Sequence, residues 1–124
     1  MDPICLEYAL TEAERIQFES QGFLFVEDAL TEDQIERLTA AVDRLHADAI
    51  EADQTEPGKP WGKANLLGQD EAFLDLVDNP HVLPKIWGIM GWNIFSYHPP
   101  PHVKPPAAKD TDEAEGWMEW HRDS

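Results

Sequence analysis

The run Thr31-Glu-Asp-Gln-Ile-Glu-Arg-Leu-Thr-Ala-Ala-Val-Asp-Arg-Leu-His-Ala-Asp-Ala49 decides the fold of this chain. It opens with a capping box, in which Thr31 and Gln34 satisfy the free backbone amides of a helix start. Apolar residues then recur at steps of three and four on one helical face: Ile35, Leu38, Val42, Leu45 and Ala49. The run therefore predicts a long amphipathic helix, with His46 at the boundary of its apolar face.

A second capping box, Thr11 with Glu14, lies upstream of this helix. The short helix that follows is expected to carry Ile16 inward and to end at Gln21-Gly22, because glycine tolerates the left-handed conformation of a C-cap. The next four residues, 23–26, read Phe-Leu-Phe-Val. This aromatic and β-branched run is typical of a buried strand.

Downstream, a loop rich in proline and glycine leads to two more helices. A short amphipathic helix is predicted over 70–77, with Phe73, Leu74 and Val77 inward. Asn79-Pro80 then resembles the cap and first turn of another helix. Its predicted inner face comprises Val82, Leu83, Ile86, Ile89 and Met90.

Apart from the run at 23–26, strands are predicted only near the end of the chain, over 92–98 and 117–123. The expected fold class is therefore α+β, with a helical front half packed against a sheet. His81 follows Asn79-Pro80 and is expected to face solvent.

Composition narrows the classes of partner. The net charge is −16, with 25 acidic residues against nine Lys and Arg, which argues against nucleic-acid partners and anionic membranes. No apolar stretch approaches the roughly 18–20 residues that span a bilayer, and no secretory signal precedes the chain. A lone cysteine, Cys5, fits a reducing compartment. We therefore expect a cytoplasmic protein without a membrane partner.

His121-Arg122-Asp123 is the stretch with the clearest chemical pattern. Strand side chains alternate between faces, so His121 and Asp123 would project together and Arg122 would point away from them. One imidazole and one carboxylate form two-thirds of the 2-His-1-carboxylate triad that holds Fe(II). Taken alone, the spacing is also compatible with coincidence, and a zinc site using His98, His102 and His121 remains an alternative.

Five segments resemble the phytanoyl-CoA dioxygenase family, and they occur in the order expected for that family: 10–38, 73–80, 91–98, 104–106 and 120–124. The resemblance implies a double-stranded β-helix (a jelly-roll, cupin-like fold) with helices packed outside it. It also implies an Fe(II)- and 2-oxoglutarate-dependent dioxygenase that hydroxylates a small organic substrate. By resemblance, His121 and Asp123 match iron ligands and Lys63 matches a lysine near 2-oxoglutarate. Lys104 matches a structural Lys-Pro-Pro turn.

The family's second iron-binding histidine and the arginine that binds 2-oxoglutarate lie beyond the His-x-Asp strand, and the sequence contains neither. Arg122 cannot replace that arginine, because it points to the opposite face from His121 and Asp123. The expectation is therefore a single, C-terminally truncated domain over residues 1–124, with an incomplete barrel and no activity of its own. The alternative is a non-catalytic helical module for binding or regulation.

Overall fold

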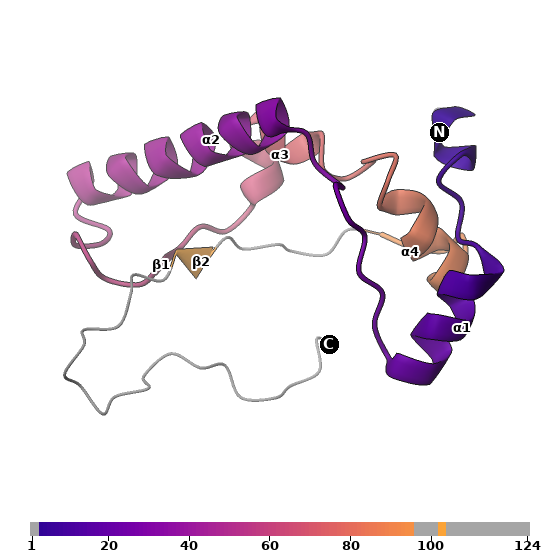
Figure 1. The fold of residues 1–124 in the computed structure, drawn as a ribbon. Coiled ribbons are helices and arrows are strands. Elements are labelled where there is room, and N and C mark those ends of the chain that lie inside the picture. Colours follow the sequence, from indigo (N-terminus) through magenta and orange to yellow (C-terminus); the bar gives the residue numbers. More distant parts are fainter. Residues whose placement is uncertain (1–2, 96–101, 104–124) are drawn as a thin grey trace.

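The computed structural model describes residues 3–95 and 102–103, and this part of the chain is mostly helical. Two strands of two residues each form an antiparallel pair (Figure 1). The helical front half predicted from the sequence is confirmed. The elements, in order, are the 3-10 helix η1 (Pro3–Leu6), α1 (Glu12–Gln21), α2 (Glu32–Glu51), β1 (Trp61–Gly62), the 3-10 helix η2 (Leu66–Gly68), α3 (Glu71–Leu74), α4 (Leu83–Met90) and β2 (His102–Val103).

Both predicted capping boxes are present. The Thr11 hydroxyl accepts from the backbone N–H of Glu14, whose carboxylate accepts from the backbone N–H of Thr11. Thr31 and Gln34 repeat this reciprocal pair at the start of α2. Helix α1 ends at Gly22 with φ of 81°, the left-handed conformation that favours glycine. The predicted N-termini of α1 and α2 and the predicted C-terminus of α1 are thus confirmed.

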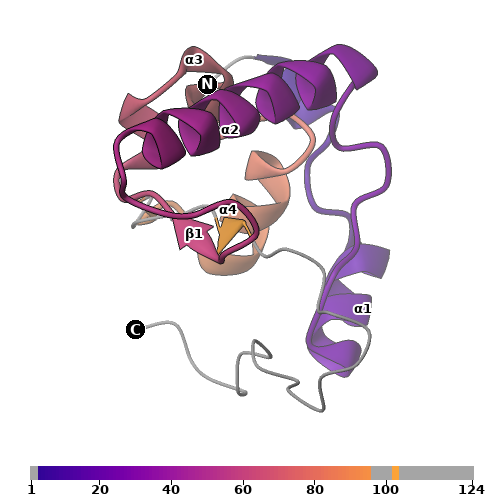
Figure 2. The ribbon, with the colours of Figure 1, turned by 90° about the vertical axis from the view of Figure 1, so that its left-hand side faces the viewer.

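The main core lies between α2 and the segment that returns beneath it. Three small or aliphatic residues of α2 (Ala41, Leu45 and Ala49) pack with three residues of the returning segment (Trp61, Leu66 and Phe73). Figure 2 shows α2 passing over β1. Leu45 and Ala49 are buried as predicted, and Leu38 and Val42 border the same cluster, whereas Ala41 was not among the residues predicted for this face.

A second, smaller assembly joins the chain start to α4, which packs against η1. Cys5 and Pro84 are fully buried. Gly88 allows close approach of the Leu10 side chain, because a Cβ at Gly88 would lie 2.6 Å from the Cβ of Leu10. The Arg15 guanidinium donates to the Gly88 carbonyl at 2.9 Å, which ties α1 to the same helix.

Asn79 connects the two assemblies and is 3% exposed. Its Nδ2 donates to the Ala29 carbonyl at 2.9 Å, and its Oδ1 accepts from the backbone N–H groups of His81 and Val82. The prediction that Asn79 caps the helix with Pro80 in its first turn is wrong in position, because α4 begins at Leu83 with Val82 as its N-cap, and the Asn79 side chain closes the preceding turn instead. One buried amide holds the loop before α2 against the turn before α4.

Several residues expected to face inward are exposed, which corrects those predictions. They are Ile16, Ile35, Leu74, Val77, Ile86 and Met90. Each has the right helical position, but burial also needs a neighbouring element opposite that face. Helix α1 buries no residue at all.

The strand predicted over 23–26 does not form. Phe23 and Phe25 are 58% and 74% exposed, and no described segment pairs with them. Residues 92–95 are likewise not a strand, whereas the rest of that prediction and the whole of 117–123 lie outside the described residues. A hydrophobic run becomes a strand only where a second strand supplies hydrogen-bonding partners.

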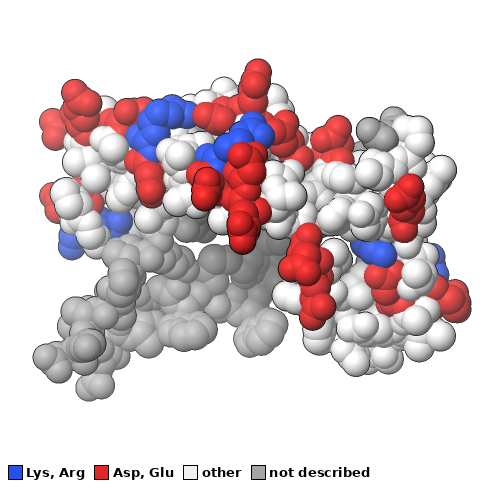
Figure 3. Space-filling view, turned by 45° about the horizontal axis from the view of Figure 1, so that its top comes forward, with Lys and Arg blue, Asp and Glu red and all other residues white. Residues whose placement is uncertain are grey.

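The outer face of α2 is covered with charged side chains of both signs (Figure 3). Arg37 pairs with Asp75 at 3.0 Å, and Arg44 pairs with Asp70 at 2.7 Å, which links α2 to the α3 region. None of the helices within residues 3–95 is both long and apolar enough to cross a membrane.

Replacing Phe73 by Ala should cost about 3–4 kcal/mol of unfolding free energy, because it leaves a cavity where a side chain only 2% exposed now packs. The matched control is Leu74→Ala, since Leu74 is 51% exposed and should lose far less. Urea denaturation followed by circular dichroism measures both. Equal losses in the two variants would contradict the core as described.

Replacing Asn79 by Asp tests the hydrogen bonds that connect the loop before α2 to the turn before α4. The carboxylate keeps an acceptor for His81 and Val82 but has no donor for the Ala29 carbonyl, so we expect a loss of about 2–3 kcal/mol. Asp78→Asn, the reverse exchange at the exposed preceding residue, should change stability little. Similar denaturation midpoints for Asn79→Asp and the unmodified chain would refute the importance of this contact.

Candidate functional site

The predicted iron ligands, His121 and Asp123, lie outside the described residues, as does Lys104. Lys63 is described, and it is half-buried directly after β1. Within the described chain, no group of three His, Cys, Asp or Glu side chains is arranged to hold a metal ion. The structure thus locates one of the three predicted site residues.

The position of Lys63 is set by the pairing of β1 with β2. Trp61 lies opposite Val103 and Gly62 opposite His102, in antiparallel register. Trp61 is buried under α2, which fixes the β1 end of this ladder in the main core. The backbone directly before Lys63 is thereby held against residues 102–103.

His46 occupies the boundary position predicted for it. Its ring lies against the indole of Trp61, with centroids 5.5 Å apart. Its Nε2 atom is buried and has no hydrogen-bond partner among the described residues. The imidazole acts here as part of the wall of the main core.

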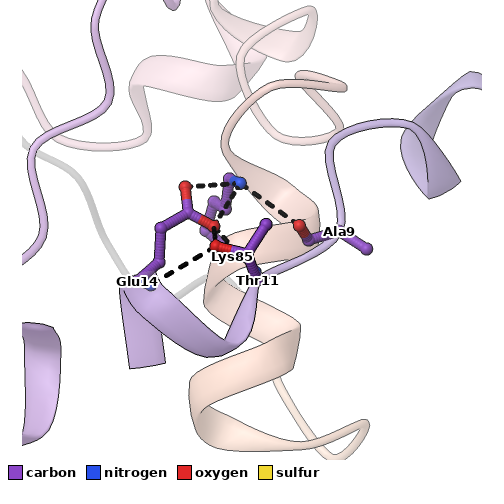
Figure 4. Close-up of polar contacts among 4 residues, drawn as sticks. All are labelled: Ala9, Thr11, Glu14 and Lys85. Carbon is purple, nitrogen blue, oxygen red and sulfur yellow. Dashed lines mark hydrogen bonds and ion pairs between the residues drawn. The ribbon is translucent and has the colours of Figure 1, made fainter. Parts of the chain in front are cut away.

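A polar network joins α1 to α4, and the sequence analysis did not single it out. The Lys85 ammonium donates to the Glu14 Oε2 atom at 2.8 Å and to the Ala9 carbonyl at 3.2 Å, and it forms an ion pair with Glu14 Oε1 at 2.7 Å (Figure 4). The Lys85 side chain is only 12% exposed. The ammonium is thus bound to Glu14 and to Ala9, so this lysine holds two elements together rather than presenting a free amine.

Glu14 is stabilised in its charged form. Partial burial pushes the pKa of its carboxyl upward, but hydrogen bonds from Lys85 and from the backbone and hydroxyl of Thr11, together with the Lys85 charge, outweigh burial. The pKa of Glu14 therefore lies below its ordinary value. The same carboxylate caps α1 and binds α4.

His81 borders this network and is half-buried, which corrects the expectation that it faces solvent. Its ring packs on Tyr8 at 4.0 Å between centroids, and its Nδ1 lies 3.2 Å from the Asp28 carbonyl. A cleft of about 370 Å³ opens here, and it is lined by Tyr8, Glu14, Phe25, Val26, Glu27, Asp28, His81 and Lys85. Most of its polar groups already serve contacts within the chain.

A second depression is apolar and larger, about 630 Å³. We call it the apolar groove, and its lining residues are Leu76, Val77, Asp78, Leu83, Ile86, Met90, Asn93, Ile94 and Phe95. Among the described residues, its lining has one ionisable side chain, Asp78, and no histidine, cysteine or lysine. Such a lining suits binding rather than acid–base or nucleophilic chemistry.

Comparisons of this chain with protein-family models, with curated proteins and with solved structures find no match.

The Glu14–Lys85 pair predicts a pH-dependent contribution to stability. A carboxyl whose pKa is lowered by folding stabilises the fold above its unfolded pKa of about 4.3, and this stabilisation disappears as the pH falls through the folded value. At pH 7, Glu14→Gln should therefore cost about 1–2 kcal/mol, and the difference from the unmodified chain should vanish near pH 3.

Two further variants complete this test. Lys85→Met removes the cation from the pair while Glu14 keeps its bonds from Thr11, so it should also lower stability at pH 7 and weaken the same pH dependence. Glu19→Gln, on the exposed side of α1, removes the same charge without a partner and serves as the control. A Glu14→Gln deficit that persists unchanged at pH 3 would contradict the role of the charged pair.

Proposed function

We propose that this chain forms part of an Fe(II)- and 2-oxoglutarate-dependent oxygenase that hydroxylates a small organic molecule. His121 and Asp123 are the proposed iron ligands, and Lys63 is proposed to bind a carboxylate of 2-oxoglutarate. The fold implied by this function is a jelly-roll, and the described helices would form its outer layer. The resemblance of five ordered segments to the phytanoyl-CoA dioxygenase family supports the proposal.

The donor chemistry of the proposed ligands fits the metal. A neutral imidazole and a carboxylate are the ligand types of non-haem Fe(II) sites that leave positions open for other ligands. The described residues offer no competing cluster of three such groups. When bound, iron with 2-oxoglutarate supplies the oxidation that inserts oxygen into a C–H bond.

The observation that carries the proposal is the β1–β2 pair. It fixes the two residues directly before Lys63, Trp61 and Gly62, against Val103 and His102, some forty positions away in the sequence. In the proposed function, the Lys63 ammonium neutralises an anionic cosubstrate within a protein of net charge −16, where such local compensation is needed.

A second candidate function is a non-catalytic binding module. The apolar groove favours it, since its lining carries binding surface without catalytic groups.

Metal binding tests the proposed ligands. Fe(II) should bind the full 124-residue chain under anaerobic conditions with micromolar or weaker affinity, because two protein ligands do not close a coordination sphere. His121→Ala and Asp123→Ala should each weaken binding about tenfold or more, measured by equilibrium dialysis. His81→Ala, which removes an imidazole from a different part of the chain, is the control.

Cosubstrate binding provides an independent readout. Lys63→Met should weaken binding of 2-oxoglutarate to the iron-loaded chain, whereas Lys59→Met removes a nearby charge from the exposed loop and should not. Fe(II) affinity that stays unchanged in both ligand variants would overturn the assignment of the metal site. If Lys63→Met and Lys59→Met weakened 2-oxoglutarate binding equally, the assignment of Lys63 to the cosubstrate would be overturned.

A further inference from the structure

The apolar groove is formed by two consecutive parts of the chain, 76–78 and 83–95, with the turn at Asn79 between them. The hydrogen bonds of Asn79 to Ala29, His81 and Val82 hold this turn in place. The walls therefore keep their relative position without a ligand. A preformed groove binds a partner without an ordering cost on its own side.

The apolar side chains of the groove are substantially exposed. Met90 is 70% exposed, Val77 43% and Ile86 41%. Exposed apolar patches of this kind, bounded by polar residues, mark binding surfaces on soluble proteins. The groove thus offers apolar area that a partner can remove from water.

Charge limits what that partner can be. Four of the basic side chains in the described residues already have partners: Arg15 bonds the Gly88 carbonyl, while Arg37, Arg44 and Lys85 pair with carboxylates. Within residues 3–95 and 102–103, no basic side chain lines the groove, whereas Asp78 does. With a net charge of −16, the chain repels any anionic occupant and attracts a cationic one.

This criterion separates the candidate occupants. A second copy brings the same net charge of −16 and is repelled. The chain's own residues 104–124 contain six acidic residues and three basic ones, so they also carry excess negative charge. A basic segment of another protein with apolar side chains fits the apolar lining and is attracted by the negative net charge of this chain.

We propose that the apolar groove binds an amphipathic, basic helical segment of a partner protein. Such a helix presents apolar side chains at i, i+3, i+4 and i+7 to the apolar lining, while its Lys or Arg side chains are attracted by Asp78 and by the net charge of −16. This function is separate from the proposed oxygenase chemistry and uses none of its residues.

Two synthetic peptides of about 16 residues test the proposal. Both carry Leu at the same helical positions, and the remaining positions are Lys in one peptide and Glu in the other. Fluorescence anisotropy with the full 124-residue chain should show binding of the Lys peptide, weakened by added salt, and none of the Glu peptide.

Variants locate the binding surface. Ile86→Lys and Met90→Lys should each weaken binding of the Lys peptide about tenfold, since they place like charge in the groove. Both sites are exposed, and circular dichroism checks that the helices persist. Ile16→Lys is the matched control, because Ile16 is 58% exposed on α1 and does not line the groove. His121→Ala should leave peptide binding unchanged, which separates this test from that of the metal site.

Four outcomes would overturn the proposal. The first is equal affinity for the Lys and Glu peptides, and the second is an equal loss in Ile16→Lys. The third is a dimer in sedimentation equilibrium that Ile86→Lys dissociates, which would identify a second copy as the occupant. The fourth is tighter peptide binding by Trp117→Asp, which would identify the chain's own C-terminal residues as the occupant.

Discussion

The buried amide of Asn79 is the interaction on which the arrangement of this chain depends. Each of the two assemblies is small, and the amide bridges the loop that enters α2 and the turn that enters α4. A buried polar group is stable only when its hydrogen-bonding capacity is used, and Asn79 donates once and accepts twice. This requirement is directional, so it sets the relative orientation of the two assemblies in a way that apolar contact alone would not.

The features that could be predicted from the sequence are those whose partners lie within a few residues. The capping boxes of Thr11 and Thr31, the C-cap at Gly22 and the amide acceptor of Asn79 were all recognisable from local spacing. These interactions form whatever the rest of the chain does, because donor and acceptor are joined by three residues or fewer. The main face of α2 was also predictable, from Leu38 to Ala49.

The features that could not be predicted depend on distant residues. Lys85 meets Glu14 across 71 positions, and β1 meets β2 across the length of three helical segments. No local pattern encodes such contacts. For the same reason Ile16 and Met90 were expected to be buried, since periodicity identifies a face but not the element opposite it. For the candidate site, the residue types could be predicted from the sequence. Of the three predicted residues, only Lys63 lies in the part of the chain that the structure describes.

Helix α1 has a consequence for how the molecule opens. It buries no residue, and the contacts that hold its first turns are polar ones made by Glu14 and Arg15. Its release would expose little apolar surface, so the free energy of that step would depend only weakly on denaturant concentration. Amide hydrogen exchange would detect the step, because local openings expose backbone N–H groups well below the global unfolding energy. Helix α1 should therefore open at a lower free energy than the buried segments on either side of it, η1 with Cys5 and α2 with Leu45.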